Sequence, residues 1–279
     1  MLRLASAFVV AGLVILSSSA FAQYDPVPGP SPYGPQDQAG ASNTQGPAKV
    51  KEAKKLIKQG VVLQLGHVYE EGMPQFPGTH PWLLSLKPPE AVADQVSVGE
   101  VLDGPIEIGQ LGTQFDALGH FGYLPPGSEG FGEVLFYNEQ TGDDLLPPEE
   151  PNRGLARLGV EHIRPYFTRG ILLDVARYAN GGQRLVAGQE ITVEMLLLTL
   201  EAQGLEPDDI GEGDAVLVRT GHEELWNAPN YYLDDVPGFG VTLAEPGLGL
   251  DAAIWLADRK IGLIGSDNWG IDVLPNVNA

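Results

Sequence analysis

The chain has 279 residues, a formal net charge of −21 at pH 7 and no cysteine. So acidic a chain repels the phosphates of nucleic acids and the anionic surface of membranes, and we expect neither as a partner. The lack of cysteine excludes disulfides, thiolate nucleophiles and cysteine-ligated metal sites. A small-molecule substrate stays compatible with this charge, because a bound metal cation can dominate the field of a pocket.

Residues 1–22 have the pattern of a secretory signal peptide. Arg3 supplies the positive charge, residues 5–16 form a short apolar run, and Ala20-Phe21-Ala22 is a small-residue cleavage site. The apolar run is shorter than a comfortable membrane span. We therefore expect a periplasmic or secreted protein without a membrane anchor after removal of the signal.

The next segments predict an arm and the start of a domain. Residues 23–48 are rich in Pro, Gly, Ser and Gln, which predicts an extended arm. A single domain is then expected over 49–279, opening with a basic helix over 49–58 that Gly60 ends. The apolar run 61–65 predicts a strand.

The middle of the chain is less regular in sequence. Residues 106–111 predict a strand that leads into a polar cluster. Residues 125–153 are dominated by Gly, Pro and acidic residues. They predict a long surface excursion, which in a compact domain often forms a lid or a binding loop.

The second half alternates predicted strands and helices. Thr192 is a candidate N-cap for a helix over 193–203, and Gly204 is a candidate stop. The other expected elements are strands at 170–174, 215–220 and 261–266, and a helix at 249–258. The unbroken apolar run at 170–174 predicts a fully buried strand. This alternation indicates an α/β or mixed α+β domain.

Residues 110–120 hold the strongest polar cluster. Gln110, Gln114, Asp116 and His120 lie at spacings of four, two and four, and Gly112 and Gly119 let the backbone turn between them. Carboxylate oxygen, amide oxygen and imidazole nitrogen are ligands for divalent metals. A turn capped by its own Asp and Gln side chains would use the same residues.

Other candidate residues follow the predicted strands. His222 follows the strand at 215–220, at a strand end where ligands often bind, although a plain loop histidine is the favoured reading. Asp267 follows the strand at 261–266 and could complete a pocket or cap a turn. Trp226, Tyr231 and Trp269 could stack on an aromatic substrate or serve in packing. His67 and His80 are expected at the surface, and His162 is expected to be solvated.

The frame Gly112-Thr113 to Asp116 and His120 resembles the signature of the cyclase family, which includes bacterial kynurenine formamidases and isatin hydrolases. Further matching segments run in the family's order: Tyr33 to Ala41 with Asn43, Met73 to Gly78, Arg169 to Arg177, Ile191-Thr192, Gly213 to Gly221, and Pro246 to Asp272. The resemblance covers roughly residues 32 to 276 of the chain.

The resemblance implies a swivelling β/β/α fold, a divalent metal, and hydrolysis of an amide or cyclic amide. It implies that Asp116 binds the metal and that His120 is catalytic or contacts the metal. Gln110 and Gln114 fall where formamidases carry histidine ligands, and we expect manganese or zinc with amide oxygens among the ligands. The resemblance also suggests a homo-oligomer.

Two departures leave alternatives open. The two glutamines differ from the formamidase pattern. The family also continues beyond the Gly-x-Asp segment with further metal ligands, so we expect this chain to be truncated at its C-terminus or to be a naturally shortened member. The protein could instead be a lactone or other cyclic-ester hydrolase, or an inactive member of the family that binds a small molecule.

Overall fold

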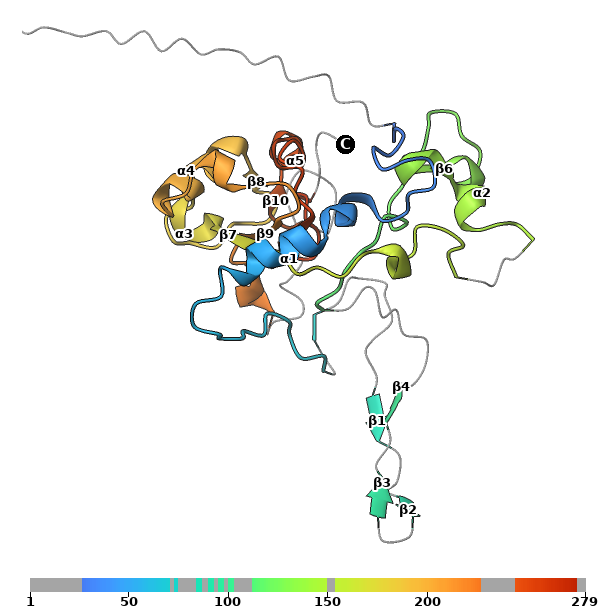
Figure 1. The fold of residues 1–279 in the computed structure, drawn as a ribbon, viewed down its shortest axis with the longest axis horizontal. Helices are drawn as coiled ribbons and strands as arrows, with labels where there is room; N and C mark the ends of the chain where they lie inside the picture. The colour runs from blue at the N-terminus through green and yellow to red at the C-terminus, as the bar shows by residue number, and fades with distance from the viewer. Residues whose placement is uncertain are drawn as a thin grey trace, which may run out of the picture.

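The computed structural model describes residues 27–70, 73–74, 84–86, 90–92, 95–97, 100–102, 112–149, 154–226 and 244–274. The predicted signal peptide, the predicted strand at 106–111, and the candidate residues Gln110, Tyr231 and His80 lie outside these ranges. The larger part is built on a parallel sheet, a smaller part carries β5, β6 and α2, and the strands β1 to β4 extend away from both (Figure 1).

The central sheet has three parallel strands in the order β11-β9-β7. They are β7 (Gly170–Asp174), β9 (Ala215–Arg219) and β11 (Leu263–Ser266). All three predicted strands are confirmed, and so is the mixed α/β class. Because the strands are parallel, their carboxyl ends meet at one edge of the sheet.

One face of the sheet packs on helices. Side chains alternate along a strand, so Ile171 and Leu173 of β7 share a face with Val216 and Val218 of β9, and all four are buried. The helices of this layer are α3 (Val175–Tyr178), α4 (Val193–Ala202) and α5 (Leu250–Ala257). Their contribution to the core includes Val175, Ala176, Leu196, Leu200, Ala252 and Leu256.

The prediction that β7 is buried throughout was wrong, because only alternate side chains of this strand are buried, and among the described strands β7 lies at the edge of the sheet. Leu172 points to the face opposite the helices and is 51% exposed. Gln203 covers part of the free edge: its amide nitrogen donates to the Leu172 carbonyl at 2.7 Å, and its side-chain oxygen accepts from the Asp174 N–H at 3.0 Å. The side-chain amide thus substitutes for a neighbouring strand.

The local signals around α4 are confirmed. The Thr192 hydroxyl accepts from the Met195 N–H at 3.3 Å, as an N-cap does. Gly204 ends the helix with φ of +70°, a conformation that favours glycine. Just before α4, β8 (Glu190–Ile191) pairs in parallel with β10 (Gly247–Leu248).

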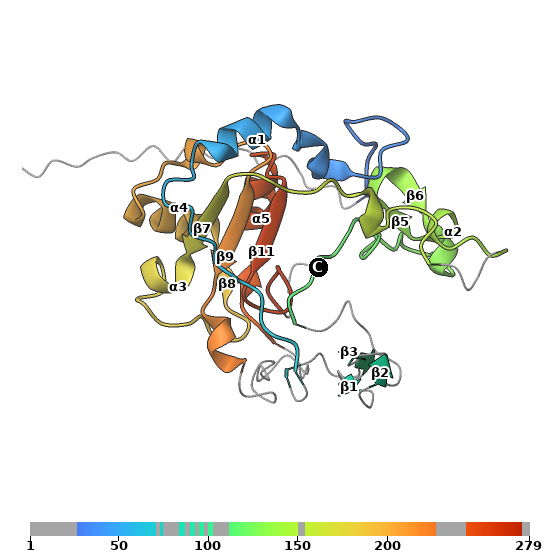
Figure 2. The same cartoon turned by 60° about the horizontal axis from the view of Figure 1, so that its bottom comes forward.

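The N-terminal arm is packed on the domain. The 3-10 helix η1 (Gly40–Thr44) leads into α1 (Pro47–Lys54), and α1 lies across the amino ends of the central strands (Figure 2). The Lys49 ammonium pairs with the buried Asp214 carboxylate at 2.7 Å. The predicted helix at 49–58 therefore begins two residues earlier and ends four residues earlier than expected, with Pro47 at its first turn.

Residues 61–65 do not form the predicted strand. Their apolar side chains are strongly exposed, with Val62 at 93%. A strand needs a partner for its backbone groups, and among the described residues none pairs with this segment. The β-forming composition alone was therefore misleading.

The smaller part corrects the expectation of an excursion over 125–153. It contains β5 (Leu135–Phe136) paired with β6 (Gln140–Thr141), and α2 (Gly142–Leu145), which a capping box on Thr141 begins. Phe136, Leu145 and Leu158 form a core of its own. A few apolar side chains between the glycines and acidic residues supply this core. The segment is therefore packed rather than an extended surface loop.

The remaining elements are short. Strand β1 (Leu84–Leu86) pairs with β4 (Glu100–Leu102), and β2 (Glu90–Val92) pairs with β3 (Gln95–Ser97), both antiparallel. The 3-10 helices are η3 (Phe131–Glu133), η4 (Tyr137–Glu139), η5 (Val160–His162), η6 (Pro207–Asp209) and η7 (His222–Leu225). In the described part of the chain, every helix is too short or too polar to cross a bilayer.

Candidate functional site

The Gly112–His120 turn carries the first group of candidate residues. Gly112 has φ of +53°, and a Cβ placed there would lie 2.5 Å from the Tyr69 ring, so glycine is required by both backbone and space. Gly119 donates its N–H to the Leu158 carbonyl at 3.2 Å, and the His120 N–H closes a turn on Ala117 at 3.0 Å. Both glycines therefore shape the turn, as the sequence suggested.

Three of the predicted ligands converge on this turn. The Gln114 amide nitrogen donates to Oδ2 of Asp116 at 3.3 Å, and Nε2 of His120 lies 3.8 Å from the same oxygen. The Asp116 and His120 side chains are 41% and 34% exposed, so solvent and a small molecule can reach them. The fourth predicted ligand, Gln110, lies outside the described residues.

The chemistry of this group fits a divalent ion in part. It offers a carboxylate, an imidazole and an amide, and the Gln114 side-chain oxygen is buried without a hydrogen-bond partner among the described residues. These are ligands that manganese and zinc accept. No group of three or more His, Asp or Glu side chains within the described ranges is placed to hold a metal. Among the described residues, such an ion would therefore have the Gln114 amide oxygen as its third ligand beside Asp116 and His120.

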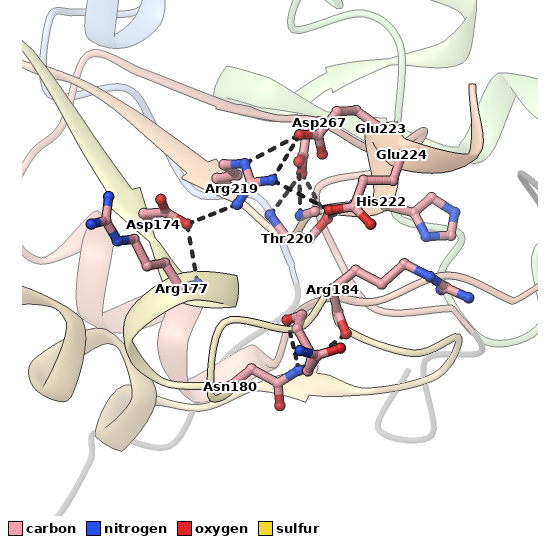
Figure 3. Close-up of polar contacts among 12 residues, drawn as sticks. Asp174, Arg177, Asn180, Arg184, Arg219, Thr220, His222, Glu223, Glu224 and Asp267 are labelled. Carbon is pink, nitrogen blue, oxygen red and sulfur yellow. Dashed lines mark hydrogen bonds and ion pairs between the residues drawn. The ribbon is translucent and has the colours of Figure 1, made fainter. Parts of the chain in front are cut away.

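A second polar group lies at the carboxyl end of the central sheet (Figure 3). The Asp267 carboxylate, just after β11, accepts from the Thr220 N–H at 2.7 Å, the Thr220 hydroxyl at 2.6 Å and the Gly221 N–H at 2.9 Å. Gly221 has φ of +80°, and its Cβ position is blocked by the Arg184 backbone at 2.9 Å. Asp267 thus caps the turn that leads from β9 into η7.

Arg219, at the end of β9, holds three acidic residues near this turn. Its guanidinium donates to Asp174 at 3.1 Å and to Glu223 at 3.0 Å, and Glu224 lies at 3.7 Å. Burial, followed by the hydrogen bond and charge of Asp267, raises the pKa of Glu223 to about 7. Burial also acts to raise the pKa of Asp267, but its hydrogen bonds with Glu223, Thr220 and Gly221 outweigh it and lower that pKa. A proton on Glu223 thus stabilises ionised Asp267.

The other residues predicted for a substrate pocket are largely packed. His222 is fully buried, and Trp226 is 8% exposed. Trp269 is half-buried and packs with Tyr69 and Leu225 around Met73 and Trp226, which we call the aromatic cluster. These positions favour a supporting role for Trp226, because little of its surface is open to a ligand. Tyr231 lies outside the described residues, and His162 is exposed as expected.

The segment 66–69 connects the two polar groups. The His67 ring stacks on the Trp226 ring with centroids 4.3 Å apart, and the His67 N–H donates to the Thr113 hydroxyl at 3.1 Å. The Tyr69 hydroxyl donates to the Thr113 carbonyl at 2.5 Å. The aromatic cluster therefore contacts the Gly112–His120 turn through Tyr69.

Sequence reasoning missed two contacts of this arrangement. His67 is exposed, as expected, but the stacking of its ring on Trp226 was not anticipated. Glu245 was not singled out, although it is fully buried and its carboxylate binds the backbone of Trp269 and Gly270. The only sequence signal for Glu245 is an acid placed directly before Pro246-Gly247 in an otherwise apolar segment.

A cavity lies elsewhere, beside α1. Its volume is about 420 Å³, and its lining includes Leu56, Ile57, Phe167 and Arg169. None of the candidate site residues lines it. The cavity belongs to the amino end of the sheet, and the chemistry of the chain gathers at the opposite end.

Comparisons with known proteins agree with this architecture. The family model described as "Putative cyclase" matches residues 63–273. A solved structure, described as the crystal structure of a novel cyclase, is similar with a TM-score of 0.68 and 25% identity, over 87% of this chain and 76% of that chain. A search of curated proteins gave no match. The matched segment spans most of the chain, including both polar groups, and the protein belongs to the cyclase family.

Proposed function

We propose that the protein is a metal-dependent hydrolase of a small amide or cyclic amide. The observation that carries this proposal is the convergence of Gln114, Asp116 and His120 on one accessible turn. His67 and Tyr69 hold the backbone of this turn in place through their hydrogen bonds to Thr113. Membership of the cyclase family supports an enzymatic role.

Asp116 and Gln114 would hold the divalent ion, with His120 beside them. When bound, such an ion polarises a carbonyl and makes a bound water more acidic. His120 has the position and exposure to take a proton from an attacking water and return it to the leaving nitrogen. Gln114 also orients Asp116 through the 3.3 Å hydrogen bond.

The first test is a substrate panel with metal analysis. We expect the purified full chain to carry or take up manganese or zinc, and to hydrolyse at least one member of a set of aryl formamides, lactams and lactones. Preferred turnover of a lactone would indicate that the protein is a cyclic-ester hydrolase instead. Absence of both metal uptake and turnover would overturn the hydrolase proposal in favour of a small-molecule-binding member.

The second test is mutational. Asp116→Ala and His120→Ala should each lower kcat about 100-fold or more, because each removes a group that acts on the reacting atoms. His162→Ala is the matched control, since His162 is exposed and its imidazole lies 3.6 Å from the carboxylate of its neighbour Glu161. Activity retained by both site variants would overturn the assignment of this turn as the active site.

We further propose that the protein is exported and assembles as a homo-oligomer. Residues 1–22 support export, and the exposed apolar side chains at 61–65 support a covered surface in an assembly. Light scattering after size exclusion should give a mass above 29.8 kDa. Cell fractionation should place the mature chain outside the cytoplasm, and a cytoplasmic location would contradict export.

A further inference from the structure

Glu245 is a fully buried carboxylate bound mainly to backbone. One of its oxygens accepts from the Trp269 N–H at 2.8 Å and the other from the Gly270 N–H. Among the described residues, no lysine or arginine pairs with it. Burial raises the pKa of this carboxyl to about 8, so its position imposes an electrostatic cost. A simple packing role would be served at lower cost by an apolar side chain.

The turn at 267–270 is held from two sides. Asp267 binds it to the end of β9 through Thr220 and Gly221, and Glu245 binds its other half. The side-chain amide of Asn268 also donates to the Pro246 carbonyl. The turn that carries Trp269 is therefore fixed to two neighbouring segments by side chains, and Glu245 supplies two of those hydrogen bonds.

Contacts run without a break from this turn to the candidate active site. Trp269 packs in the aromatic cluster against Met73 and Trp226. Trp226 stacks on His67, and His67 donates to Thr113, which directly precedes Gln114. A displacement of Trp269 would thus be transmitted to the Gly112–His120 turn through packed rings and one hydrogen bond.

We propose that Glu245 is a positioning residue, which holds the 267–270 turn so that Trp269 packs in the aromatic cluster and supports the Gly112–His120 turn. Glu245 is fully buried, so it acts through the backbone and does not touch substrate. Its effect on turnover rests on the proposed hydrolase function, whereas its effect on Trp269 does not.

The structural arm of the test measures the accessibility of Trp269 by acrylamide quenching. The Trp269 signal is the difference between each protein and the same protein with Trp269→Phe. In Glu245→Gln, one acceptor oxygen becomes an NH2 group that cannot accept, and the quenching constant of Trp269 should rise at least about twofold as the turn opens more often. Asp214→Asn is the matched control, a buried carboxylate at the other end of the sheet, and it should leave this constant unchanged.

A second variant acts on the same contact from the other side. In Gly270→Ala, the added Cβ would lie 2.8 Å from Oε1 of Glu245 and displace it without changing charge. It should raise the Trp269 quenching constant as Glu245→Gln does, and it serves if Glu245→Gln fails to fold. An unchanged quenching constant in the folded variants would overturn the proposal.

The kinetic arm separates positioning from general damage. Both variants should lower kcat about tenfold while KM stays within about threefold, because the displaced turn carries the groups that act on the reacting atoms. Asp214→Asn should lower stability without this change in kcat. A wild-type protein without turnover would overturn the hydrolase proposal, and the quenching result would then decide the role of Glu245 alone.

Discussion

The two ends of the β11-β9-β7 sheet bury carboxylates in different ways. At the amino end, Asp214 is compensated by two cations, Lys49 at 2.7 Å and the Arg169 guanidinium, and by the Gly211 N–H at 2.9 Å. At the carboxyl end, Glu245 and Asp267 are held mainly by backbone N–H groups and hydroxyls. The first arrangement fastens the N-terminal arm to the domain, and the second leaves Glu245 without a cation partner among the described residues.

The pKa values of the two buried carboxyls differ in the same way. Burial acts to raise the pKa of Asp214, but its bonds with Arg169 and Lys49 outweigh burial and lower it. Burial dominates at Glu245 and raises its pKa to about 8. Strongly perturbed carboxyls without a matched cation are commoner at functional sites, because stability alone would not select them.

The largest expected loss of stability comes from removing Asp214, the carboxylate at the amino end of the sheet. Asp214→Ala leaves Lys49 and Arg169 without their shared partner, and we expect a loss of about 3 kcal/mol in the free energy of unfolding. Denaturant unfolding at neutral pH measures it. Asp258→Ala, at an exposed position, is the control and should change stability little. A loss below about 1 kcal/mol would show that the arm is not fastened by this pair.

The next effect is a pH dependence that differs between the ends. A carboxyl whose pKa is raised on folding binds more protons in the folded state, so its contribution favours the folded state at low pH and is lost as pH rises through the folded pKa. For Glu245 this window runs from the ordinary glutamate pKa of 4.5 up to a pKa of about 8. Between pH 6 and pH 8 the wild type should lose about 2 kcal/mol more than Glu245→Gln does.

At the amino end of the sheet, the pH dependence of stability has the opposite sign. The pKa of Asp214 is lowered below the ordinary aspartate value of 3.8, so its stabilisation is present above that value and is lost as pH falls. Asp214→Asn should therefore flatten the acid limb of the stability curve and leave the limb above pH 6 unchanged. Thermal unfolding from pH 2 to pH 9 checks both limbs. Equal pH profiles for the two variants would remove the distinction between the ends.

The smallest expected loss of stability comes from removing the N-cap of α4, and it should not depend on pH. Thr192→Ala removes the N-cap of α4, which lies in the helical layer rather than at the polar groups of either sheet end, and should cost about 1 kcal/mol at every pH. Thr192→Ser keeps the hydroxyl and should restore the loss. A pH-dependent effect of Thr192→Ala would mean that the ends are coupled through the helical layer.

Local signals predicted a large part of the α/β unit. The apolar runs at 170–174, 215–220 and 261–266 became the central strands, and Thr192 and Gly204 mark the ends of α4. These succeed because a cap, a stop or a buried strand depends on neighbouring residues and on a simple period. The run at 61–65 has the same local character but no described strand beside it, so its prediction failed.

In the candidate site, too, local features could be predicted and long-range contacts could not. The spacing of Gln114, Asp116 and His120 could be read from the sequence, because all three lie within a few residues around a turn. The burial of His222, the stacking of His67 on Trp226 and the role of Glu245 could not. Each of these joins segments far apart in the chain, and no local period records such a contact.

By itself, the sequence determined the composition of the site: an acidic, cysteine-free chain with a carboxylate, an imidazole and amides gathered around two glycines. It also determined the strands and helices whose signals are local. Only the tertiary structure decided which carboxylates are neutralised by cations and which are held by backbone N–H groups. That outcome depends on which distant segments come together at each end of the sheet. Burial and the available partners, rather than residue type, then determine the free-energy cost of a charged carboxylate.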